Sequence, residues 1–241
     1  MTISLQGKRI FVAGATGAIG RAILEAAREA GAWVGGSYFR SEAEANSLTG
    51  QGFFMVQADL SDRTQARRAV ASALEQGPLD AFVYAAGNTR DHTFLKLTDS
   101  DWDEVMKLHL EGLVACTQAV LGSMRDRRCG KIIAIGSMSG FIGRPGQANY
   151  SAAKAATVAF MKTIAQETGR FGISANVICP GFIDSGMTRA APPEAWERAK
   201  ADSALGTISS VETAASFTVW LLSDLAKGVT GQIFQLDSRI V

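Results

Sequence analysis

Short apolar runs alternate with longer helix-like patterns along the whole chain, and this alternation constrains the fold more than any other feature of the sequence. Seven runs have the length and the flanking turn residues of strands: 9–14, 32–38, 53–58, 80–87, 131–137, 173–181 and 231–237. Between them lie six helix-like stretches: 18–30, 42–49, 62–76, 99–127, 148–168 and 210–223. Strands separated by helices require crossover connections and a parallel sheet covered on both faces. The sequence therefore predicts a three-layer, doubly wound α/β fold with a seven-stranded parallel sheet.

The chain contains 241 residues, of which 47% are hydrophobic and 20% are charged, enough to build one large core. No repeat, low-complexity linker or change of composition marks a second domain, so we expect a single domain over residues 1–241. The least regular stretch is 181–209, which contains two consecutive prolines. We expect this stretch to form a lobe that covers a substrate.

Charge and hydropathy exclude several classes of protein. The formal net charge is +1, with 24 basic and 23 acidic residues, which argues against a nucleic-acid-binding protein. No apolar run reaches the roughly 20 residues that span a bilayer. The strand-like run that begins at residue 9 leaves no room for a signal peptide ahead of it. We therefore expect a cytoplasmic protein that binds neither nucleic acid nor membrane.

Cysteine and histidine are too few and too scattered for a metal site. The three cysteines are widely spaced, which indicates reduced thiols. The two histidines cannot build a recognisable zinc site or a usual Ser-His-Asp triad. We expect no metal, and an enzyme of this sequence would need an acid/base group other than histidine.

A glycine-rich turn follows the first predicted strand and leads into the first predicted helix. Its glycines have the spacing Gly-x-x-Gly-x-x-Gly, at Gly14, Gly17 and Gly20. Free backbone N–H groups and the positive end of the helix dipole at such a turn suit a pyrophosphate. Small residues at a tight strand–helix junction also serve simple packing. The position of the turn, after the first strand of an alternating pattern, favours nucleotide binding.

The residues after the second and third strands bear on the choice of cofactor. An NAD-binding protein usually places an acidic residue after the second strand, whereas an arginine there suits the 2′-phosphate of NADP. Tyr38 and Phe39 stand where the acid is expected and Arg40 follows, which favours NADP over NAD. The alternative is that Arg40 is a solvated surface charge. After the third strand, Asp59 either accepts a hydrogen bond from the adenine amino group or caps the next helix.

Tyr150 and Lys154 stand four residues apart in the predicted helix 148–168. Residues at this spacing lie on the same face of a helix, within reach of one another. An ammonium group beside a phenol favours the phenolate and lowers the pKa of the phenol from about 10. We therefore expect Lys154 to lower the pKa of Tyr150, so that the tyrosine exchanges protons near neutral pH.

Several segments of the chain resemble the short-chain dehydrogenases/reductases, and among them most of all the 3-oxoacyl-acyl-carrier-protein reductases. They are the glycine-rich turn, YAAGNTRD at 84–91, IIAIGSMSG at 132–140, QANYSAAK at 147–154 and NVICPGFIDSGMT at 176–188. Tyr-x-x-x-Lys alone is a weak motif. A serine after the strand upstream of it and a Pro-Gly after the next strand make the combination specific. The resemblance implies a Rossmann-type domain that binds NAD(P) over residues 1–241.

The resemblance also assigns roles to individual residues. Tyr150 is the general acid that protonates the carbonyl oxygen as hydride arrives, and Lys154 lowers the pKa of this tyrosine and holds the nicotinamide ribose. Ser137 donates a hydrogen bond to the substrate oxygen. The implied cofactor-binding residues are Gly14, Thr16, Gly17, Ile19, Arg40, Asp59, Leu60, Ala86, Gly87, Tyr150, Lys154, Pro180, Gly181 and Ile183.

The sequence departs from the family pattern at four places. In the glycine-rich turn, Ala13 and Ala18 replace a threonine and a glycine, and Gly17 occupies a position that is basic in many NADP-dependent members. After the fourth strand, the sequence Tyr-Ala-Ala-Gly at 84–87 replaces Asn-Asn-Ala-Gly. The usual C-terminal Asp-Gly-Gly is replaced by LDSRIV at 236–241.

The fourth departure is His109, which aligns with a catalytic asparagine that holds a water in a proton relay to the lysine. A histidine can donate and accept hydrogen bonds as well, so we expect His109 to take over in the relay. It would then add a titration near neutral pH that asparagine lacks. The alternative is a packed histidine without a relay role.

The resemblance implies a 3-oxoacyl thioester substrate, bound to an acyl carrier protein or to coenzyme A. Arg128 and Arg170 are candidates for docking an acidic carrier protein. Cations at a helix C-terminus, such as those of RDRRCGK at 125–131, are also favoured by the helix dipole alone. Other ketones (polyketide, sugar-alcohol or steroid-like) are an alternative substrate class, and the lobe at 181–209 would decide between them.

Two long predicted helices, 99–127 and 148–168, are apolar on more than one face. The resemblance accordingly implies a homodimer or homotetramer. A hetero-oligomer is an alternative, in which this chain is a weakly active or non-catalytic subunit of a reductase complex. The intact Ser137, Tyr150 and Lys154 argue against a non-catalytic subunit.

Overall fold

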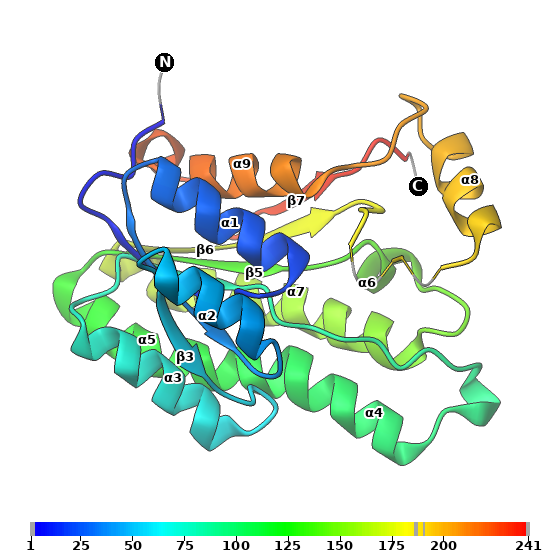
Figure 1. Cartoon of the computed structure of the whole chain (residues 1–241), viewed down its shortest axis with the longest axis horizontal. Coiled ribbons are helices and arrows are strands. Elements are labelled where there is room, and N and C mark those ends of the chain that lie inside the picture. The colour runs from blue at the N-terminus through cyan, green and yellow to red at the C-terminus, as the bar shows by residue number, and fades with distance from the viewer. Residues whose placement is uncertain (1–2, 186–187, 190, 240–241) are drawn as a thin grey trace.

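A computed structural model describes residues 3–185, 188–189 and 191–239 of the chain (Figure 1). Its parallel sheet has seven strands in the order β3-β2-β1-β4-β5-β6-β7, which confirms the predicted fold class. The strands are β1 (Arg9–Ala13), β2 (Trp33–Tyr38), β3 (Phe54–Gln57), β4 (Ala81–Tyr84), β5 (Gly130–Ile135), β6 (Ile173–Pro180) and β7 (Ile233–Leu236). The order reverses between β1 and β4, so the switch point of the sheet lies between these two strands.

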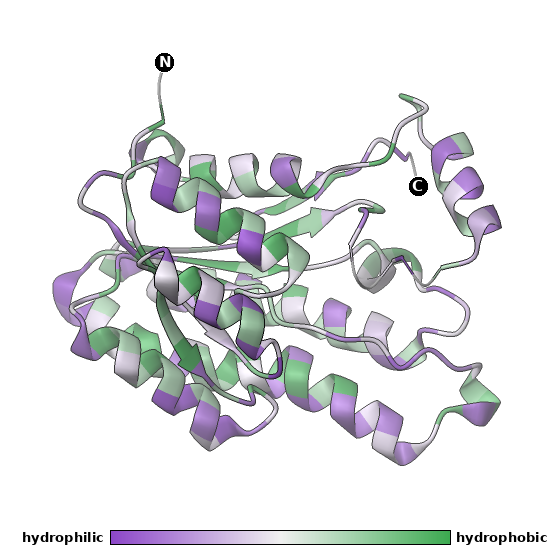
Figure 2. Ribbon diagram, in the orientation of Figure 1, coloured by the Kyte–Doolittle hydropathy of each residue, from purple (hydrophilic) through white to green (hydrophobic). Residues whose placement is uncertain are grey.

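Helices cover both faces of the sheet, and each face has its own apolar core. One core contains residues of α1 (Ala18–Glu29), α2 (Glu42–Gly50) and α9 (Val211–Leu222). The other contains residues of α3 (Arg63–Glu75), α5 (Gly112–Arg127) and α7 (Ala148–Thr168). Figure 2 shows that hydrophobic residues dominate the central strands, whereas hydrophilic and hydrophobic residues alternate along the covering helices. This pattern is typical of a buried parallel sheet between amphipathic helices.

Shorter elements lie mostly in the connections. They are α4 (Asp99–Met106), α6 (Ser139–Ile142), α8 (Pro193–Ala201), the 3₁₀ turns η1 (Phe94–Lys96), η3 (Gly169–Phe171) and η4 (Asp224–Ala226), and the π-helical turn η2 (Lys107–Glu111). None of the helices in the described ranges is both long and apolar enough to cross a membrane.

The turn between β1 and α1 packs directly against the residues that follow β4. Gly14 has a φ of +80°, and a Cβ at this position would lie 2.7 Å from the backbone of Ala86. A Cβ at Gly20 would lie 2.2 Å from the carbonyl oxygen of Gly14. Only glycine fits these two positions, so part of the glycine pattern serves packing, as one of the two sequence interpretations held.

The predicted helix 99–127 is interrupted by the π-helical turn η2, which the sequence pattern did not indicate. The hydroxyl of Tyr84 donates a hydrogen bond to the carbonyl oxygen of Leu108. In a continuous α-helix this carbonyl would accept from the N–H of Gly112. Gly112 has no Cβ, and one at that position would lie 2.4 Å from the Tyr84 hydroxyl. The inserted phenol therefore accounts for the wider turn, which places His109 on the inner side of the helix.

The stretch 181–209 is more regular than the sequence suggested. It contains α8, and the ring of Phe182 packs edge-on against Trp196, with centroids 4.9 Å apart. A short bridge pairs Ser203 with Arg239 and so ties the stretch to the chain end. Positions 186, 187 and 190 of this predicted lobe, and positions 240 and 241 of the divergent C-terminus, lie outside the described residues.

Candidate active site

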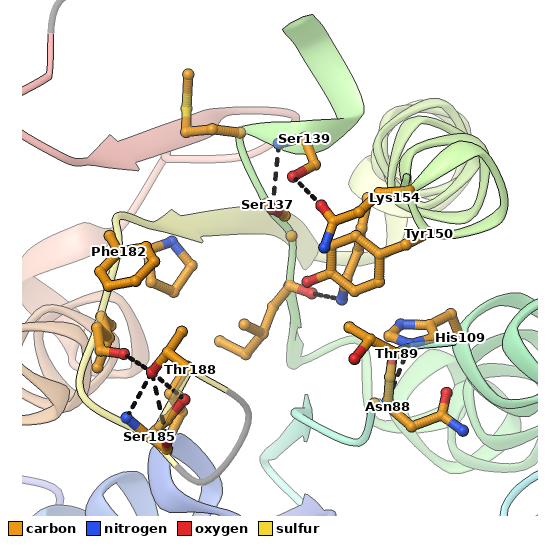
Figure 3. Close-up of a pocket in the computed structure, with 18 of the residues that line it drawn as sticks. Asn88, Thr89, His109, Ser137, Ser139, Tyr150, Lys154, Phe182, Ser185 and Thr188 are labelled. Carbon is orange, nitrogen blue, oxygen red and sulfur yellow. Dashed lines mark hydrogen bonds between the residues drawn. The ribbon is translucent and has the colours of Figure 1, made fainter. Parts of the chain in front are cut away.

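A cavity of about 570 Å³ opens at the carboxyl ends of β1, β4, β5 and β6, next to the switch point of the sheet. Most of the residues predicted for the site line it: Gly17, Ile19, Ala86, Gly87, His109, Ser137, Tyr150, Lys154, Pro180, Gly181 and Ile183. Five others do not contribute to its lining, namely Gly14, Thr16, Arg40, Asp59 and Leu60. Figure 3 shows how labelled residues from several elements face one another across this space.

Ser137, Tyr150 and Lys154 meet on one side of the cavity (Figure 3). Ser137 follows β5, and its hydroxyl accepts a hydrogen bond from the N–H of Ser139 at 3.1 Å. Tyr150 and Lys154 lie one turn apart on α7, with the Lys154 Nζ 5.6 Å from the centroid of the tyrosine ring. This Nζ donates a hydrogen bond to the carbonyl oxygen of Ile135 at 2.7 Å.

The electrostatics of the pair differ from the sequence-based expectation. The pKa of Tyr150 is raised, chiefly because the phenol is buried; the Ser137 side chain acts in the opposite direction, and the Asp91 carboxylate adds to the rise. Burial lowers the pKa of Lys154 to about 8. The prediction that Tyr150 exchanges protons near neutral pH is wrong here, because the Lys154 ammonium binds the Ile135 carbonyl and desolvation outweighs the attraction between the two groups. Tyr150 is therefore a protonated donor at neutral pH.

His109 packs against Tyr150 from the π-helical turn. Its side chain is 2% exposed, and the two ring centroids lie 5.2 Å apart at an interplanar angle of 87°. Its Nε2 lies 2.8 Å from the carbonyl oxygen of Asn88. Its Nδ1 is buried without a hydrogen-bond partner among the described residues.

The imidazole of His109 is neutral at physiological pH. Burial is the main cause that lowers its pKa to about 3, and the charge of Lys154 acts in the same direction. The predicted titration near neutral pH is therefore wrong, because burial and the neighbouring cation both disfavour the charged imidazolium. A role of the neutral ring in a proton relay stays a prediction.

Asn149 was missed in the sequence, although it holds Tyr150 in place. It is fully buried, and its Oδ1 accepts a hydrogen bond from the backbone N–H of Tyr150 at 2.8 Å. Its Nδ2 donates to the carbonyl oxygens of Arg90 at 3.1 Å and Asp101 at 3.2 Å. The start of α7 is thus tied both to the segment after β4 and to α4. An amide in the first turn of a largely apolar helix was the available signal.

Further polar residues of the cavity wall were also missed. The Gln147 Oε1 accepts from the Ser139 hydroxyl at 3.1 Å, and its Nε2 donates to the Asp91 carboxylate at 2.9 Å. The other missed residues that line the cavity include Asn88, Thr89, Arg90, Arg144, Phe182, Ser185, Thr188 and Arg239. They lie in loops, where no periodic pattern identifies the direction of a side chain.

The wall beneath the glycine-rich turn suits a phosphate group. Gly17 caps α1, and no side chain among the described residues accepts from the first-turn N–H groups of this helix. Gly17, Ala18 and Ile19 line the cavity. Unpaired N–H groups at the positive end of a helix dipole bind anions, so these residues fit the pyrophosphate of a dinucleotide.

Arg40 and Asp59 follow the neighbouring strands β2 and β3. They therefore lie at the carboxyl ends of the strands, as the cavity does. Arg40 is exposed, with its guanidinium carbon 5.0 Å from the centroid of the Phe39 ring. The Asp59 Oδ1 accepts from the N–H of Ser61 at 2.9 Å and from its hydroxyl at 2.6 Å. The cap of α3 is instead Asp62, which accepts from two N–H groups of the first turn, so the capping interpretation of Asp59 is wrong.

Arg128 and Arg170 lie at the opposite end of the sheet from the cavity, because they precede β5 and β6 whereas the cavity follows these strands. Arg128 donates a hydrogen bond to the carbonyl oxygen of Arg170 at 2.7 Å. Lys131, in the same basic segment, donates to the carbonyl oxygens of Leu221 at 2.9 Å and Ser223 at 2.6 Å. It thereby stabilises the C-terminus of α9, a structural role that the basic segment alone did not indicate.

Comparisons with known proteins find relatives over nearly the whole chain. The family described as Enoyl-(Acyl carrier protein) reductase matches residues 14–238. A curated 3-oxoacyl-[acyl-carrier-protein] reductase FabG of Aquifex aeolicus is 36% identical over 246 residues, which cover 98% of each chain. An acetoacetyl-CoA reductase of Synechocystis is 34% identical over 238 residues, again with 98% of each chain covered.

Among solved structures, a gluconate 5-dehydrogenase from Burkholderia cenocepacia in complex with NADP and tartrate superposes with a TM-score of 0.91 at 27% identity. The match covers 98% of this chain and 96% of that one.

Proposed function

The chain belongs to the short-chain dehydrogenase/reductase family, and we propose that it reduces a 3-oxoacyl thioester, bound to an acyl carrier protein or to coenzyme A, with NADPH. The observation that carries the proposal is the meeting of Ser137, Tyr150 and Lys154 in one cavity at the switch point. The printed names of two relatives, a 3-oxoacyl-carrier-protein reductase and an acetoacetyl-CoA reductase, support the substrate class. We propose that one cytoplasmic domain over residues 1–241 carries the activity.

The proposed mechanism assigns the proton to Tyr150 and the polarisation of the carbonyl to Ser137. When bound, the nicotinamide supplies the hydride that adds to the carbonyl carbon. The Tyr150 hydroxyl gives its proton to the carbonyl oxygen, and the product is a 3-hydroxyacyl thioester. Ser137 donates a hydrogen bond to the same oxygen as negative charge develops on it. The Lys154 ammonium, one turn away, stabilises the phenolate that remains.

The proposed cofactor contacts follow the order of the strands. Gly14, Thr16, Gly17 and Ile19 would hold the pyrophosphate with the first turn of α1, and Ala86, Gly87, Pro180, Gly181 and Ile183 would flank the nicotinamide half. Asp59 and Leu60 would contact the adenine. Exposed Arg40, at the end of β2, would pair with a 2′-phosphate, which supports NADPH over NADH.

We propose that a second copy of the chain completes the docking of a carrier protein. The cavity and the arginines at 128 and 170 lie at opposite ends of the sheet, roughly 20 Å apart along strands of this length. One chain alone therefore does not present both to the same carrier. In a homodimer or homotetramer, the arginines of one chain could lie beside the cavity of another.

A second candidate function is the reduction of a different small ketone. The likeness to a gluconate 5-dehydrogenase favours it, because that protein is named for a sugar acid rather than a thioester. Both candidates use the same three residues and differ only in what the part of the wall that includes Phe182, Ser185 and Thr188 accepts. An inactive subunit of a reductase complex would need none of the three.

The test is to purify the chain and follow the oxidation of NADPH and NADH with an acetoacetyl thioester. We expect turnover with NADPH, and a loss of about 10²–10⁴-fold in kcat for Tyr150→Phe, because the proton donor is removed. Tyr38→Phe, at the end of β2 outside the cavity lining, is a matched control and should retain activity. Cofactor binding without turnover of any thioester would contradict the substrate class. Equal activity of Tyr150→Phe would contradict the mechanism.

A further inference from the structure

We infer that the substrate carries a carboxylate, and that Arg144 on the cavity wall binds it. The inference rests on the proposed ketone reductase and narrows its substrate class to oxo compounds with an anionic group.

Arg144 lies in a tight turn between α6 and α7, six residues before Tyr150. Gly143 has a φ of +64° and Gly146 a φ of +85°, and a Cβ at either position would meet no described atom within 4 Å. These glycines are therefore needed for the path of the backbone rather than for close packing. The Arg144 carbonyl oxygen accepts from the N–H of Gln147 at 3.0 Å, which closes the turn. The backbone thus holds the base of the Arg144 side chain at the cavity wall.

Three guanidinium groups line the cavity, and two of them are neutralised within the protein. Arg90 binds Glu104 through two hydrogen bonds, of 2.9 and 2.7 Å. Arg239 donates two hydrogen bonds to a single carboxylate oxygen of Asp237, Oδ2. Arg144, in contrast, forms no ion pair and no side-chain hydrogen bond with any described residue. Its five N–H donors remain available at the cavity wall.

The surroundings of Arg144 disfavour its charge unless an anion joins it. Burial and the neighbouring charge of Arg239 lower the pKa of its guanidinium, while Asp237 acts in the opposite direction from beyond ion-pair distance. The carboxylate that lines the cavity, Asp91, already accepts from Gln147. A half-buried guanidinium without a partner costs free energy, and a carboxylate can offset that cost with two parallel hydrogen bonds.

The same arrangement selects against neutral substrates. A neutral alkyl chain that covered Arg144 would remove water from the guanidinium without replacing its hydrogen bonds. Two kinds of substrate carry the required group: a small free oxo acid, and a 3-oxoacyl thioester whose acyl chain ends in a carboxylate. Both present a ketone and a carboxylate to one cavity, and substrates that represent each kind distinguish them.

The experiment compares three ketones with NADPH: the N-acetylcysteamine thioester of 3-oxohexanoate, the monothioester of 3-oxohexanedioate, and free 3-oxobutanoate. We expect kcat/KM for at least one carboxylate-bearing ketone to exceed that of the neutral thioester by about 10- to 100-fold, typical of a partly buried charged hydrogen bond. In Arg144→Gln this ratio should fall to about 1, and Arg144→Lys should retain part of it. A preference for 3-oxobutanoate alone identifies the free oxo acid, and a preference for the hexanedioate thioester alone identifies the acyl chain.

Arg125→Gln is the matched control. Arg125 lies in the last turn of α5 with its side chain 62% exposed and outside the cavity lining, so its loss removes the same charge at the opposite end of the sheet. The control should keep the full ratio. A ratio of about 1 in the wild-type protein, an unchanged ratio in Arg144→Gln, or an equal loss in Arg125→Gln would each overturn the inference.

A binding measurement separates this inference from the proposed reductase activity. If the wild-type protein reduces none of the three ketones, the proposed function fails. Calorimetric titration with hexanedioate and hexanoate then decides the role of Arg144. Tighter binding of hexanedioate that is lost in Arg144→Gln supports the inference, and equal binding of the two acids contradicts it.

Discussion

His109 should make the folded protein sensitive to mild acid, and the size of the effect follows from its burial. Its pKa is about 3 in the folded chain, against about 6.5 for an unfolded histidine. The unfolded chain therefore binds a proton between these two values that the folded chain rejects. Stability that is present above pH 6.5 is lost as the pH falls toward 3. The loss amounts to about 2 kcal/mol between pH 7 and pH 5, and about 4–5 kcal/mol in full.

The assay is urea denaturation of the wild-type protein and of His109→Asn at pH 7 and pH 5. Asparagine does not titrate, so the free energy of unfolding of the variant should fall by about 2 kcal/mol less than that of the wild type. Any constant cost of the substitution cancels, because only the change with pH is compared. His92→Asn, which removes the half-exposed second imidazole, is the control and should retain the acid sensitivity of the wild type.

The same variant tests what a histidine does beside Tyr150, the proposed proton donor. A neutral ring with a pKa of about 3 adds no inflection to the rate between pH 5 and pH 8. We therefore expect the pH–rate profiles of the wild type and His109→Asn to have the same shape in that range. The reasoning is refuted if both proteins lose equal stability between pH 7 and pH 5, or if an inflection near pH 6.5 disappears in the variant.

Two further predictions concern positioning and docking. Asn149→Ala leaves two carbonyl groups and the N–H of Tyr150 without their partner, so the free energy of unfolding should fall by about 2–4 kcal/mol. If Asn149 positions the tyrosine, kcat should fall more than KM changes, whereas a purely structural role would leave kcat per folded molecule unaltered. Arg128→Glu should raise KM several-fold for a carrier-bound 3-oxoacyl substrate and leave a small thioester unaffected. Equal effects on both substrates would count against docking at Arg128.

The fold was predictable because its signals are local and repeated. Each strand of the sheet is an apolar run between turn residues, and each long helix has its own pattern, so a doubly wound parallel sheet of seven strands follows from the chain. The interruption at η2 was not predictable, because it depends on a contact between Tyr84 and Leu108, 24 residues apart. The helix α8 was missed because a proline pair and a mixed composition conceal a helix of nine residues within a long connection.

Site residues were predictable where a motif combines reactive side chains with a fixed spacing in the sequence. Ser137, Tyr150 and Lys154 were placed by motif, and they do share one cavity. The direction of the pKa shifts of Tyr150 and Lys154 was not predictable, because desolvation depends on what surrounds a group in three dimensions. At the level of the sequence, Lys154 is only a charge near a phenol. In the folded chain its ammonium is bound to the Ile135 carbonyl, and the burial of both groups outweighs their attraction.

In the proposed mechanism, the shifted pKa values of Tyr150, His109 and Lys154 together favour reduction over oxidation at neutral pH. Oxidation of an alcohol needs Tyr150 as a phenolate base, which its burial disfavours, whereas reduction needs the protonated phenol that burial maintains. His109 is neutral and offers no competing acid in this range. Lys154, with a pKa of about 8, is still largely charged at pH 7 and can stabilise the phenolate left by each turnover. As the pH rises above 8 that charge is lost, so the rate of reduction should decline from there rather than near pH 10.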